Sequence, residues 1–575
     1  MIKEIRAILF LLVALAVLSS CNREAGGEGE MLRIRVTEEP DCLHPVVSQS
    51  SLATQIEQLI MPPLFEYHPD KLELSPLLVQ SLSDPIQVND STIAYDYQMI
   101  KGVVWEDGKP VTAADIVYTI KAALNPLLKN ATWRGYFKNI VDVYPDPANP
   151  AKFRIAVKRD YMLSREMSGN YCIYPEHIYD PAGAMRVYSI PDLIHRDSAS
   201  WGKQAWDSLG SYAARYQSED YCRKLITGCG PYRLLSWDAG NRIVLQKKKD
   251  WWGDGLEKDY PLLTSYPSTI EYLVIPEEAS AVLALKNKQV DLVTGLSAGQ
   301  FEALKSNSDL AFSTPAVMQY YYLEVNHRNP VMKRKEVRQA IARLLDMDKF
   351  IATQLNGLAR RIVGPVPPGK AYYHDGLKPV QFDPAEAASL LKAAGWIDSN
   401  ADGTLDCMID GKRIELVIQL SVSGKETGKN LAILLAEEAA RIGMKMELIS
   451  KETAVFMKDL NEFNFELATM AARQSPSLWD PFQAWHSSQA RPGGFNKSGY
   501  ASPLVDSLIA AIRTAPSEDL RTQAYRAFQQ HLYDEQVQIY LFSPLEKIVY
   551  RSDLELNPTT RRPGYTEGMI RFKTK

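Results

Sequence analysis

The sequence predicts a mixed α/β protein that folds around more than one hydrophobic core. Strand-like and helix-like runs alternate from Leu32 onward, a pattern typical of α/β proteins and not of a helical bundle or a β-sandwich. The chain has 575 residues, which exceeds the roughly 250–300 residues at which a single core stops growing. We therefore expect at least two lobes.

The composition excludes several classes of protein. Hydrophobic residues make up 46% and charged residues 23%, as in ordinary globular domains. Beyond the N-terminus no apolar run reaches the ~20 residues that a membrane-spanning helix needs. The 65 basic and 69 acidic residues give a net charge of -4, and no dense Lys/Arg run could hold phosphates. We expect neither an integral membrane protein nor a nucleic-acid partner.

Residues 1–20 have the pattern of a lipoprotein signal peptide. Two basic residues precede an apolar run from Ala7 to Leu18, which is too short for a membrane span. The following Ser19-Ser20-Cys21 completes a segment that resembles the bacterial lipobox. We expect Cys21 to carry a lipid and residues 21–30 to form a flexible tether. The alternative is an ordinary cleaved signal peptide in which Cys21 is incidental.

Five cysteines lie beyond Cys21, so at least one thiol stays free within a monomer. Cys222 and Cys229 are the only close pair, and a disulfide between them competes with two buried free thiols. Their spacing does not match a zinc site. The eight histidines also lack the short spacings of a preformed metal site, so we expect no metal and no cofactor.

The N-terminal third alternates clearly between strand and helix patterns. Arg33–Val36 alternates polar and apolar residues like a half-buried strand, and Ser51–Pro62 carries apolar residues at helical spacing. Tyr95–Met99 alternates again, Asp107-Gly108 is a turn dipeptide, and Thr112-Ala113-Ala114-Asp115 opens a helix with a capping pair. These signals predict a hairpin that leads into a capped helix.

The segment from Gly102 to Tyr118 resembles the signature of the bacterial extracellular solute-binding proteins of family 5, the peptide and nickel type. Further landmarks of that family recur in the same order. They include Gly228-Cys229-Gly230-Pro231-Tyr232, then Gln289-Val290-Asp291, then Tyr322–Asn326. The resemblance covers essentially the whole mature chain.

The resemblance implies the periplasmic binding protein type II fold, with two lobes, three subdomains and a ligand cleft between the lobes. The first lobe would span residues 31–312, with an inserted subdomain at about 65–225. The second lobe would span 313–543, and residues 544–575 would return to the first lobe.

Local signals in the predicted second lobe agree with this division. Asp383 as N-cap, Pro384 at the first helical position and Gly395 after the last turn bracket one helix. Leu504–Asp534 is helix-like throughout, and a closing strand, Gln538–Phe542, follows it.

The resemblance also implies a function. The chain would be the extracytoplasmic substrate-binding component of an ABC transporter, which captures a small solute by lobe closure and delivers it to membrane permease subunits. We expect a peptide as the solute; an oligosaccharide, a cell-wall fragment and a nickel chelate stay open. The protein would be a monomer without enzymatic activity, on the periplasmic or cell-surface side of a bacterial membrane and lipid-anchored through Cys21.

In related dipeptide and oligopeptide receptors a strand edge of the second lobe contacts the ligand backbone, and a following aspartate takes its ammonium group. The matching stretch begins at Met470, and the ligand-binding residues expected from it and just beyond are Ala472, Arg473, Gln474, Ser475, Trp479, Asp480 and Trp485. The position of the amine-binding acid falls on Ser475 or Ser477, and neither is acidic.

This departure bears on the ligand, because a buried ammonium group without a carboxylate is costly, whereas Arg473 would favour an anionic group. An N-blocked peptide, a peptidoglycan-type fragment and a longer peptide held by its backbone are the alternatives to a free-amine peptide. A sugar stacked on Trp479 or Trp485 is another, and both tryptophans could equally belong to the second-lobe core.

One motif points to an enzyme. Gly295-Leu296-Ser297-Ala298-Gly299 satisfies the nucleophile-elbow pattern of serine hydrolases. No oxyanion loop of the His-Gly-Gly kind precedes it, so we expect Ser297 to be a turn residue or a helix N-cap. A secreted serine hydrolase that uses Ser297 is the alternative of another class.

A second motif points to calcium. Asp398, Asn400, Asp402 and Asp406 resemble the first part of a calcium-binding loop, but Ile409 stands where the bidentate glutamate is required. A solvated Asx turn is the competing interpretation.

Overall fold

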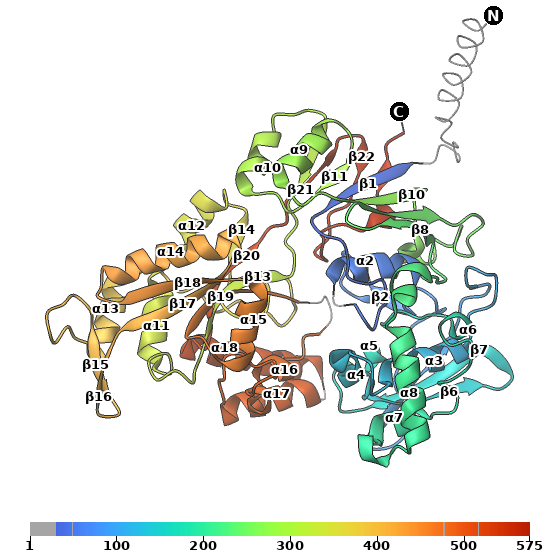
Figure 1. Cartoon of the computed structure of the whole chain (residues 1–575), viewed down its shortest axis with the longest axis horizontal. Helices are drawn as coiled ribbons and strands as arrows, with labels where there is room; N and C mark the ends of the chain where they lie inside the picture. The colour runs from blue at the N-terminus through green and yellow to red at the C-terminus, as the bar shows by residue number, and fades with distance from the viewer. Residues whose placement is uncertain (1–29, 49, 475–477, 516, 575) are drawn as a thin grey trace, which may run out of the picture.

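The computed structural model of the chain describes residues 30–48, 50–474, 478–515 and 517–574. The predicted signal peptide and Cys21 therefore lie outside the described residues, as does nearly all of the predicted tether. Figure 1 shows two bodies side by side, each built of sheets covered by helices. Among the described residues, every helix is too short or too polar to cross a membrane.

The first body contains a seven-stranded sheet whose strands come from distant parts of the sequence. The order is β12 (Leu310–Ser313), β21 (Ile548–Arg551), β11 (Leu292–Val293), β1 (Met31–Val36), β10 (Thr269–Val274), β9 (Arg242–Lys247) and β8 (Tyr232–Asp238). Helices of the same body are α2 (Ser51–Ile60), α9 (Glu278–Lys286) and α10 (Ala298–Leu304). The predicted strand at Arg33–Val36 is confirmed as β1.

A four-stranded sheet with its own helices follows α2 in the chain. Its order is β4 (Ile86–Gln87), β5 (Thr92–Gln98), β7 (Asn149–Lys158) and β6 (Ile140–Asp146), and a short ribbon, β2 (Phe65–Tyr67) with β3 (Leu74–Pro76), precedes it. Its helices are α3 (Ala113–Leu124), α4 (Ala131–Phe137), α5 (Ser164–Met167), α6 (Glu176–Tyr179), α7 (Ile190–His195) and α8 (Lys203–Tyr216). The predicted capping pair is confirmed, because Thr112 and Asp115 form a capping box at α3.

The second body is organised on a six-stranded sheet. The order is β14 (Ala359–Arg361), β20 (Ile539–Pro544), β13 (Gln319–Val325), β19 (Leu467–Arg473), β17 (Val417–Ser423) and β18 (Lys445–Lys451). Its helices are α11 (Lys335–Arg343), α12 (Met347–Gln354), α13 (Pro384–Ala393), α14 (Glu426–Ala440), α15 (Thr453–Glu462), α16 (Phe482–Trp485), α17 (Pro503–Thr514) and α18 (Glu518–Glu535). This body also contains the pair β15 (Asp406–Ile409) and β16 (Lys412–Glu415), whereas the pair β22 (Leu554–Glu555) and β23 (Arg571–Phe572) belongs to the first body (Figure 1).

Two sequence predictions for this body have different outcomes. Asp383 caps α13 by accepting a hydrogen bond from Glu386 N, and Gly395 has a φ of +87°, so the predicted helix is confirmed. The helix-like stretch Leu504–Asp534 is two helices instead of one. α17 ends before Ala515 and Ser517 caps α18, because the intervening Pro516 disfavours helical backbone in the residue before it.

The chain crosses between the two bodies twice, and the crossings lie side by side. Residues 314–318 join β12 to β13, and residues 545–547 join β20 to β21. Glu546 N donates to Pro315 O at 2.9 Å, and Ala316 and Leu545 form an isolated antiparallel bridge. Two short paired crossings of this kind have the form of a hinge between lobes.

Close backbone packing fixes the end of α2. Gly230 N donates to Ile60 O at 2.8 Å. A Cβ atom on Gly228 would lie 2.1 Å from Ile60 O, and one on Gly230 would lie 2.3 Å from Leu59 O. Only glycine therefore permits the 228–230 segment to pass this close to the last turn of α2.

A disulfide joins Cys42 to Cys222, across 180 positions of sequence. The predicted pairing of Cys222 with Cys229 is wrong, and so is the alternative of a free Cys222. Leu43 N donates to Cys222 O at 2.9 Å, which brings the loop before α2 against Cys222. Cys229 is a fully buried free thiol, because the glycines on either side hold it against α2 in the core.

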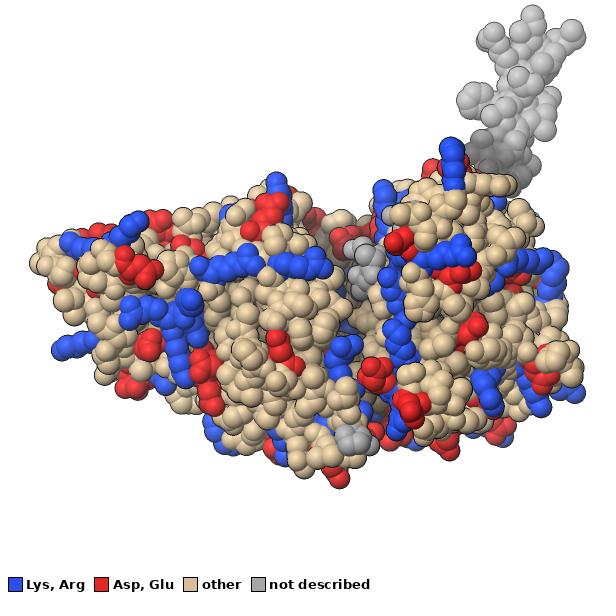
Figure 2. Space-filling view, turned by 90° about the horizontal axis from the view of Figure 1, so that it is seen from below, with Lys and Arg blue, Asp and Glu red and all other residues tan. Residues whose placement is uncertain are grey.

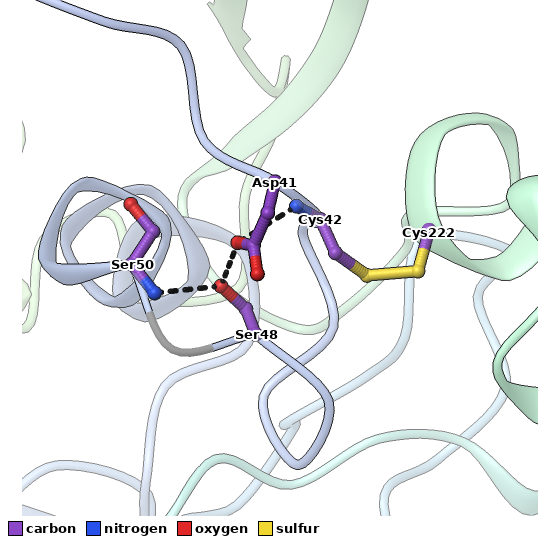
Figure 3. The surroundings of a disulfide bond; sticks show 5 residues. All are labelled: Asp41, Cys42, Ser48, Ser50 and Cys222. Carbon is purple, nitrogen blue, oxygen red and sulfur yellow. Dashed lines mark hydrogen bonds between the residues drawn. A yellow bond between two sulfur atoms is a disulfide. The ribbon is translucent and has the colours of Figure 1, made fainter. Parts of the chain in front are cut away.

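The disulfide also anchors the loop that leads into α2, as Figure 3 shows. Asp41 accepts hydrogen bonds from Cys42 N at 2.9 Å and from Ser48 Oγ at 2.5 Å. Ser48 Oγ in turn accepts from Ser50 N at 3.1 Å, and Ser50 is the N-cap of α2. A short chain of polar contacts thus connects the disulfide to the start of the helix.

Replacing both bonded cysteines, Cys42→Ser with Cys222→Ser, should lower the free energy of unfolding by about 2–4 kcal/mol, because the bond closes a long loop in the unfolded chain. Thermal denaturation with and without dithiothreitol checks this. The reductant should lower the melting temperature of the wild-type protein and leave that of the double variant unchanged. An equal effect of dithiothreitol on both proteins would contradict the bond.

Candidate functional site

A groove separates the two lobes in the space-filling view of Figure 2, and Lys and Arg side chains stand beside it. One wall carries the end of β19 from the second lobe, and the other carries the start of α2 from the first. Arg473 Nη1 lies 3.5 Å from Ser51 Oγ, so side chains of the two walls meet across the groove. Farther along, Met162 of the first lobe packs in the same apolar cluster as Tyr372 and Trp485 of the second.

The last residues of β19 have one strand edge without a neighbouring strand. β13 pairs with the whole of β19, from Gln319 opposite Arg473 to Val325 opposite Leu467, whereas β17 pairs only with Leu467 and Ala468. Gln474 N donates to Met318 O at 2.9 Å. Because hydrogen-bonded pairs alternate in an antiparallel ladder, the backbone N–H and C=O of Ala471 and Arg473 point to the other edge. Within the described part of the chain, no strand pairs with that edge.

The predicted site residues Ala472, Arg473 and Gln474 lie together at this edge. Burial and the neighbouring Arg562 lower the pKa of the Arg473 guanidinium. Arg562 Nη1 donates to Gln319 Oε1 at 2.5 Å, which holds the second guanidinium near β13. Gln474 Nε2 donates to Pro365 O, also at 2.5 Å. Two arginines thus offer donors to an anionic group at this end of the groove, and Glu546 and Glu38 offset part of their positive charge.

Ser475 and Ser477, the positions at which an amine-binding acid was expected, lie outside the described residues. The next predicted residue, Trp479, is fixed through its backbone. Trp479 N donates to Tyr372 Oη at 3.1 Å, and Tyr525 Oη donates to Trp479 O. The two tyrosine rings stack with centroids 4.0 Å apart. Both backbone groups of Trp479 are therefore held by one aromatic pair.

The side chains of Asp480 and Trp485 contact other residues of the second lobe. Asp480 Oδ2 lies 3.2 Å from Arg513 Nε, and its Oδ1 accepts from Phe482 N at 3.0 Å. Burial raises the pKa of the Asp480 carboxyl, and Arg513 opposes that shift. Trp485 is 3% exposed and packs edge-on against Phe528, so its ring lies in the second-lobe core in this structure.

The first-lobe wall contributes a residue that the sequence analysis missed. Glu57 of α2 is 2% exposed and lines a cavity of about 530 Å³. The sequence signal was present, because Glu57 falls between Ile56 and Ile60 on the buried face of an otherwise regular amphipathic helix. Helical spacing alone does not separate a buried charge from an exposed one at the border of an apolar face.

The structure places Ser297 as a helix cap. Its Oγ accepts from Gln300 N at the start of α10, and it donates to Glu278 Oε1 at 2.7 Å. The hydrogen-bond acceptor of this hydroxyl is therefore a carboxylate and not the imidazole that a hydrolytic triad uses.

The carboxylates of the calcium-like loop bond to their own loop. Asp398 accepts from Asp402 N and Gly403 N, and Asp402 accepts from Thr404 N at 2.8 Å. Asp406 accepts from Ser399 and pairs with Arg413 at 3.0 Å. These contacts have the form of Asx turns. Within the described residues, no group of three or more His, Cys, Asp or Glu is placed to hold a metal ion.

Two α/β lobes, a double crossing and a groove that presents a strand edge together define a two-lobed receptor of the periplasmic binding protein type II fold. The chain belongs to the bacterial extracellular solute-binding proteins, family 5, whose middle region matches residues 73–494. The fold class and the family predicted from the sequence are thereby confirmed.

Similar proteins agree with this assignment. The oligopeptide-binding protein AppA of Bacillus subtilis (strain 168) is 24% identical over 542 residues, which cover 93% of this chain and 91% of AppA. The solved structure of AppA with a nonapeptide has a TM-score of 0.72 at 22% identity and covers 95% of this chain and 99% of its own. NikA from Brucella suis with Fe(III)-EDTA has a TM-score of 0.76 at 20% identity and covers 94% of this chain and 100% of its own.

Tyr372→Phe removes the hydroxyl that accepts from Trp479 N. Loss of one hydrogen bond of about 1 kcal/mol should speed hydrogen exchange at this amide about fivefold, since 1.4 kcal/mol corresponds to a factor of ten. Mass spectrometry of a fragment that contains Trp479 measures the rate. Tyr373→Phe is the matched control and should leave the rate unchanged; equal rates in all three proteins would show that Tyr372 does not hold this segment.

Proposed function

We propose that the chain captures a peptide in the groove between its lobes and delivers it to the permease of an ABC transporter. The observation that carries this proposal is the unpaired edge of β19, where Ala471 and Arg473 present backbone donors and acceptors toward the groove. An extended peptide can add to such an edge through main-chain hydrogen bonds. AppA, named as an oligopeptide-binding protein and solved with a nonapeptide, supports the same substrate class.

The paired crossings provide the motion that the function needs. In our proposal the lobes, which comprise residues 31–312 with 544–575 and residues 313–543, rotate about the crossings and enclose the peptide. The ligand-binding residues would be Ala472, Arg473, Gln474, Ser475, Trp479 and Asp480. A closed form that the ligand stabilises is the state that a permease can distinguish from the empty receptor.

We also propose where the protein is located. The mature chain would be a monomer anchored through a lipid on Cys21, on the periplasmic or cell-surface side of a bacterial membrane. The lipobox-like sequence and the match to an extracellular solute-binding family support this location. The proposed role is capture without catalysis, in line with relatives that are named for what they bind.

Native mass spectrometry of the protein without its first 21 residues tests the function directly. Denaturation should release peptides that co-purified with the protein, and deletion of the gene should abolish uptake of those peptides by the cell. A released glycan or metal chelate would overturn the peptide assignment. Normal uptake after deletion would overturn the transport role.

Ala471→Pro should weaken peptide binding at least tenfold, because proline removes the backbone N–H on the free edge and leaves the β13 side of the ladder intact. Isothermal titration with a peptide identified above measures the loss. Ala471→Gly is the matched control, since it shortens the side chain and keeps the donor. Equal affinity of the proline variant and the wild type would show that this edge does not bind the peptide.

A further inference from the structure

A cavity of about 530 Å³ lies in the first lobe against α2. Its walls are the loop before α2, the side of that helix with Ser51, Thr54 and Glu57, α4 and the Tyr171-Cys172 segment. Ser51, which Arg473 approaches from the second lobe, also lines the cavity. The cavity therefore adjoins the groove next to the free edge of β19, although all of its lining residues belong to the first lobe.

Three buried polar atoms in this lining lack a hydrogen-bond partner within the described part of the chain. They are Glu57 Oε1, Asn130 Oδ1 and Tyr171 Oη, and their residues are 2%, 6% and 5% exposed. Asn130 has its amide oriented by a hydrogen bond from Nδ2 to Ala123 O, so its oxygen is the atom that is left over. A buried polar atom without a partner loses its hydrogen bonds to water and gains none in return, so three in one cavity are unusual.

The neighbouring carboxylate, Glu66, has several hydrogen-bond partners. Glu66 accepts hydrogen bonds from Gln58 Nε2 at 2.8 Å and from Tyr67 N at 2.8 Å, and it pairs with Arg561 at 3.4 Å. Arg561 is thereby engaged, and within the described residues it forms no ion pair with Glu57. The acceptors without partners call for a group rich in N–H donors.

We propose that this cavity is a ligand subsite in which Glu57, with Asn130 and Tyr171, binds a cationic nitrogen group of the ligand, an ammonium or a guanidinium. The inference rests on the proposed function and specifies the peptide that it takes. Glu57 of the first lobe would then provide the carboxylate for a cationic group of the ligand, since positions 475 and 477 of the second lobe are both serine.

The electrostatics of the cavity support this assignment. Burial and the charge of Asp41 raise the pKa of Glu57 well above its usual value, so the carboxyl is held neutral when nothing positive lies beside it. A bound cation favours the ionised form, and binding therefore releases a proton. The titratable groups close enough to Glu57 to interact with it are Asp41, Cys172, Tyr174 and Tyr179, and the cavity lining also contains Glu66, Lys129 and Arg561.

The positions of Arg473 and Glu57 on the two walls set the distance between the anionic and the cationic group of the proposed ligand. Ser51, beside Arg473, precedes Glu57 by six residues of α2, which corresponds to about 9 Å along the helix axis. An anionic group near Arg473 and Arg562 and a cationic group at Glu57 would lie at roughly this separation. Peptides that carry a carboxylate and an amine or guanidinium a few residues apart have this form.

The test begins with native mass spectrometry of the wild-type protein mixed with a synthetic pool of tri- to nonapeptides. A retained peptide is then made in three forms: unmodified, with its amines acetylated, and with citrulline in place of arginine. Removing the charge that occupies the cavity should weaken binding to the wild type at least tenfold in calorimetry. The same change should have less than a twofold effect on Glu57→Gln.

The variants separate binding from folding. Glu57→Gln should keep the wild-type melting temperature, because it replaces a neutral buried carboxyl by a neutral amide of the same size. It should also abolish the proton release that calorimetry detects in buffers of different ionisation enthalpy. Glu73→Gln makes the same chemical change at an exposed site of the same lobe and should bind like the wild type. The modified peptides test the proposal on the wild-type protein whether or not Glu57→Gln folds.

The outcomes distinguish the two proposals. Peptides that bind the wild type equally well with and without their cationic groups would overturn the subsite and leave peptide capture intact. Failure of every peptide in the pool to bind would overturn peptide capture, and the subsite with it.

Discussion

The placement of α2 is the constraint on which the first-lobe wall of the groove depends. Three contacts fix this helix, and two of them involve distant parts of the sequence. The Cys42–Cys222 disulfide holds the loop before it, Ser50 caps its first turn, and the 228–230 segment packs against its last turn. A shift of α2 would displace Glu57 and Ser51 together, because both are on one rigid helix. The ends of the helix are therefore constrained more tightly than packing of its apolar face alone would require.

The second-lobe wall of the groove presents backbone groups. The end of β19 has backbone groups that no other strand among the described residues pairs with, and in our proposal they bind an extended chain through its main chain, whatever its side chains are. The aromatic pair Tyr372 and Tyr525 fixes Trp479 just beyond that edge, so the second lobe supplies a rigid template. Selectivity for particular side chains then has to come from cavities, and the cavity beside α2 lies where a side chain leaving the β19 edge would enter the first lobe.

Much of the fold could be predicted from the sequence because the signals were local. The Thr112/Asp115 capping box, the Asp383 cap and the alternation in Arg33–Val36 each depend on residues within a few positions of one another, and each has the predicted form. The family motif supplied the division into lobes. The helix-like stretch Leu504–Asp534 is also helical, as α17 and α18, and the apolar periodicity did not show the break between them, which a local signal, Pro516, marks.

The candidate site was harder to predict because it depends on contacts between remote residues. Cys42 and Cys222 are 180 positions apart, and no spacing rule connects them. Glu57 follows the helical pattern of its neighbours, and only the three-dimensional structure shows that it lines a cavity with Asn130 and Tyr171 and that each of the three residues has a buried polar atom without a hydrogen-bond partner within the described part of the chain. Comparison with the family motif placed Ala472 and Arg473 at a strand edge, where the structure also has them. The same comparison considered a carboxylate for the ligand's ammonium group only at positions near Ser475.

The two walls contribute different contacts to the proposed ligand, and this difference determines the order in which the contacts form. The cavity with Glu57 is lined entirely by the first lobe, so it keeps its shape whether the lobes are open or closed. The β19 edge and Arg473 belong to the second lobe, and in this structure Arg473 Nη1 lies 3.5 Å from Ser51 Oγ of α2. In our proposal a cationic side chain therefore binds first to the first lobe, and the main-chain hydrogen bonds to β19 form on closure. Because only those later contacts distinguish the closed from the open state, they supply the differential affinity that shifts the lobes toward closure.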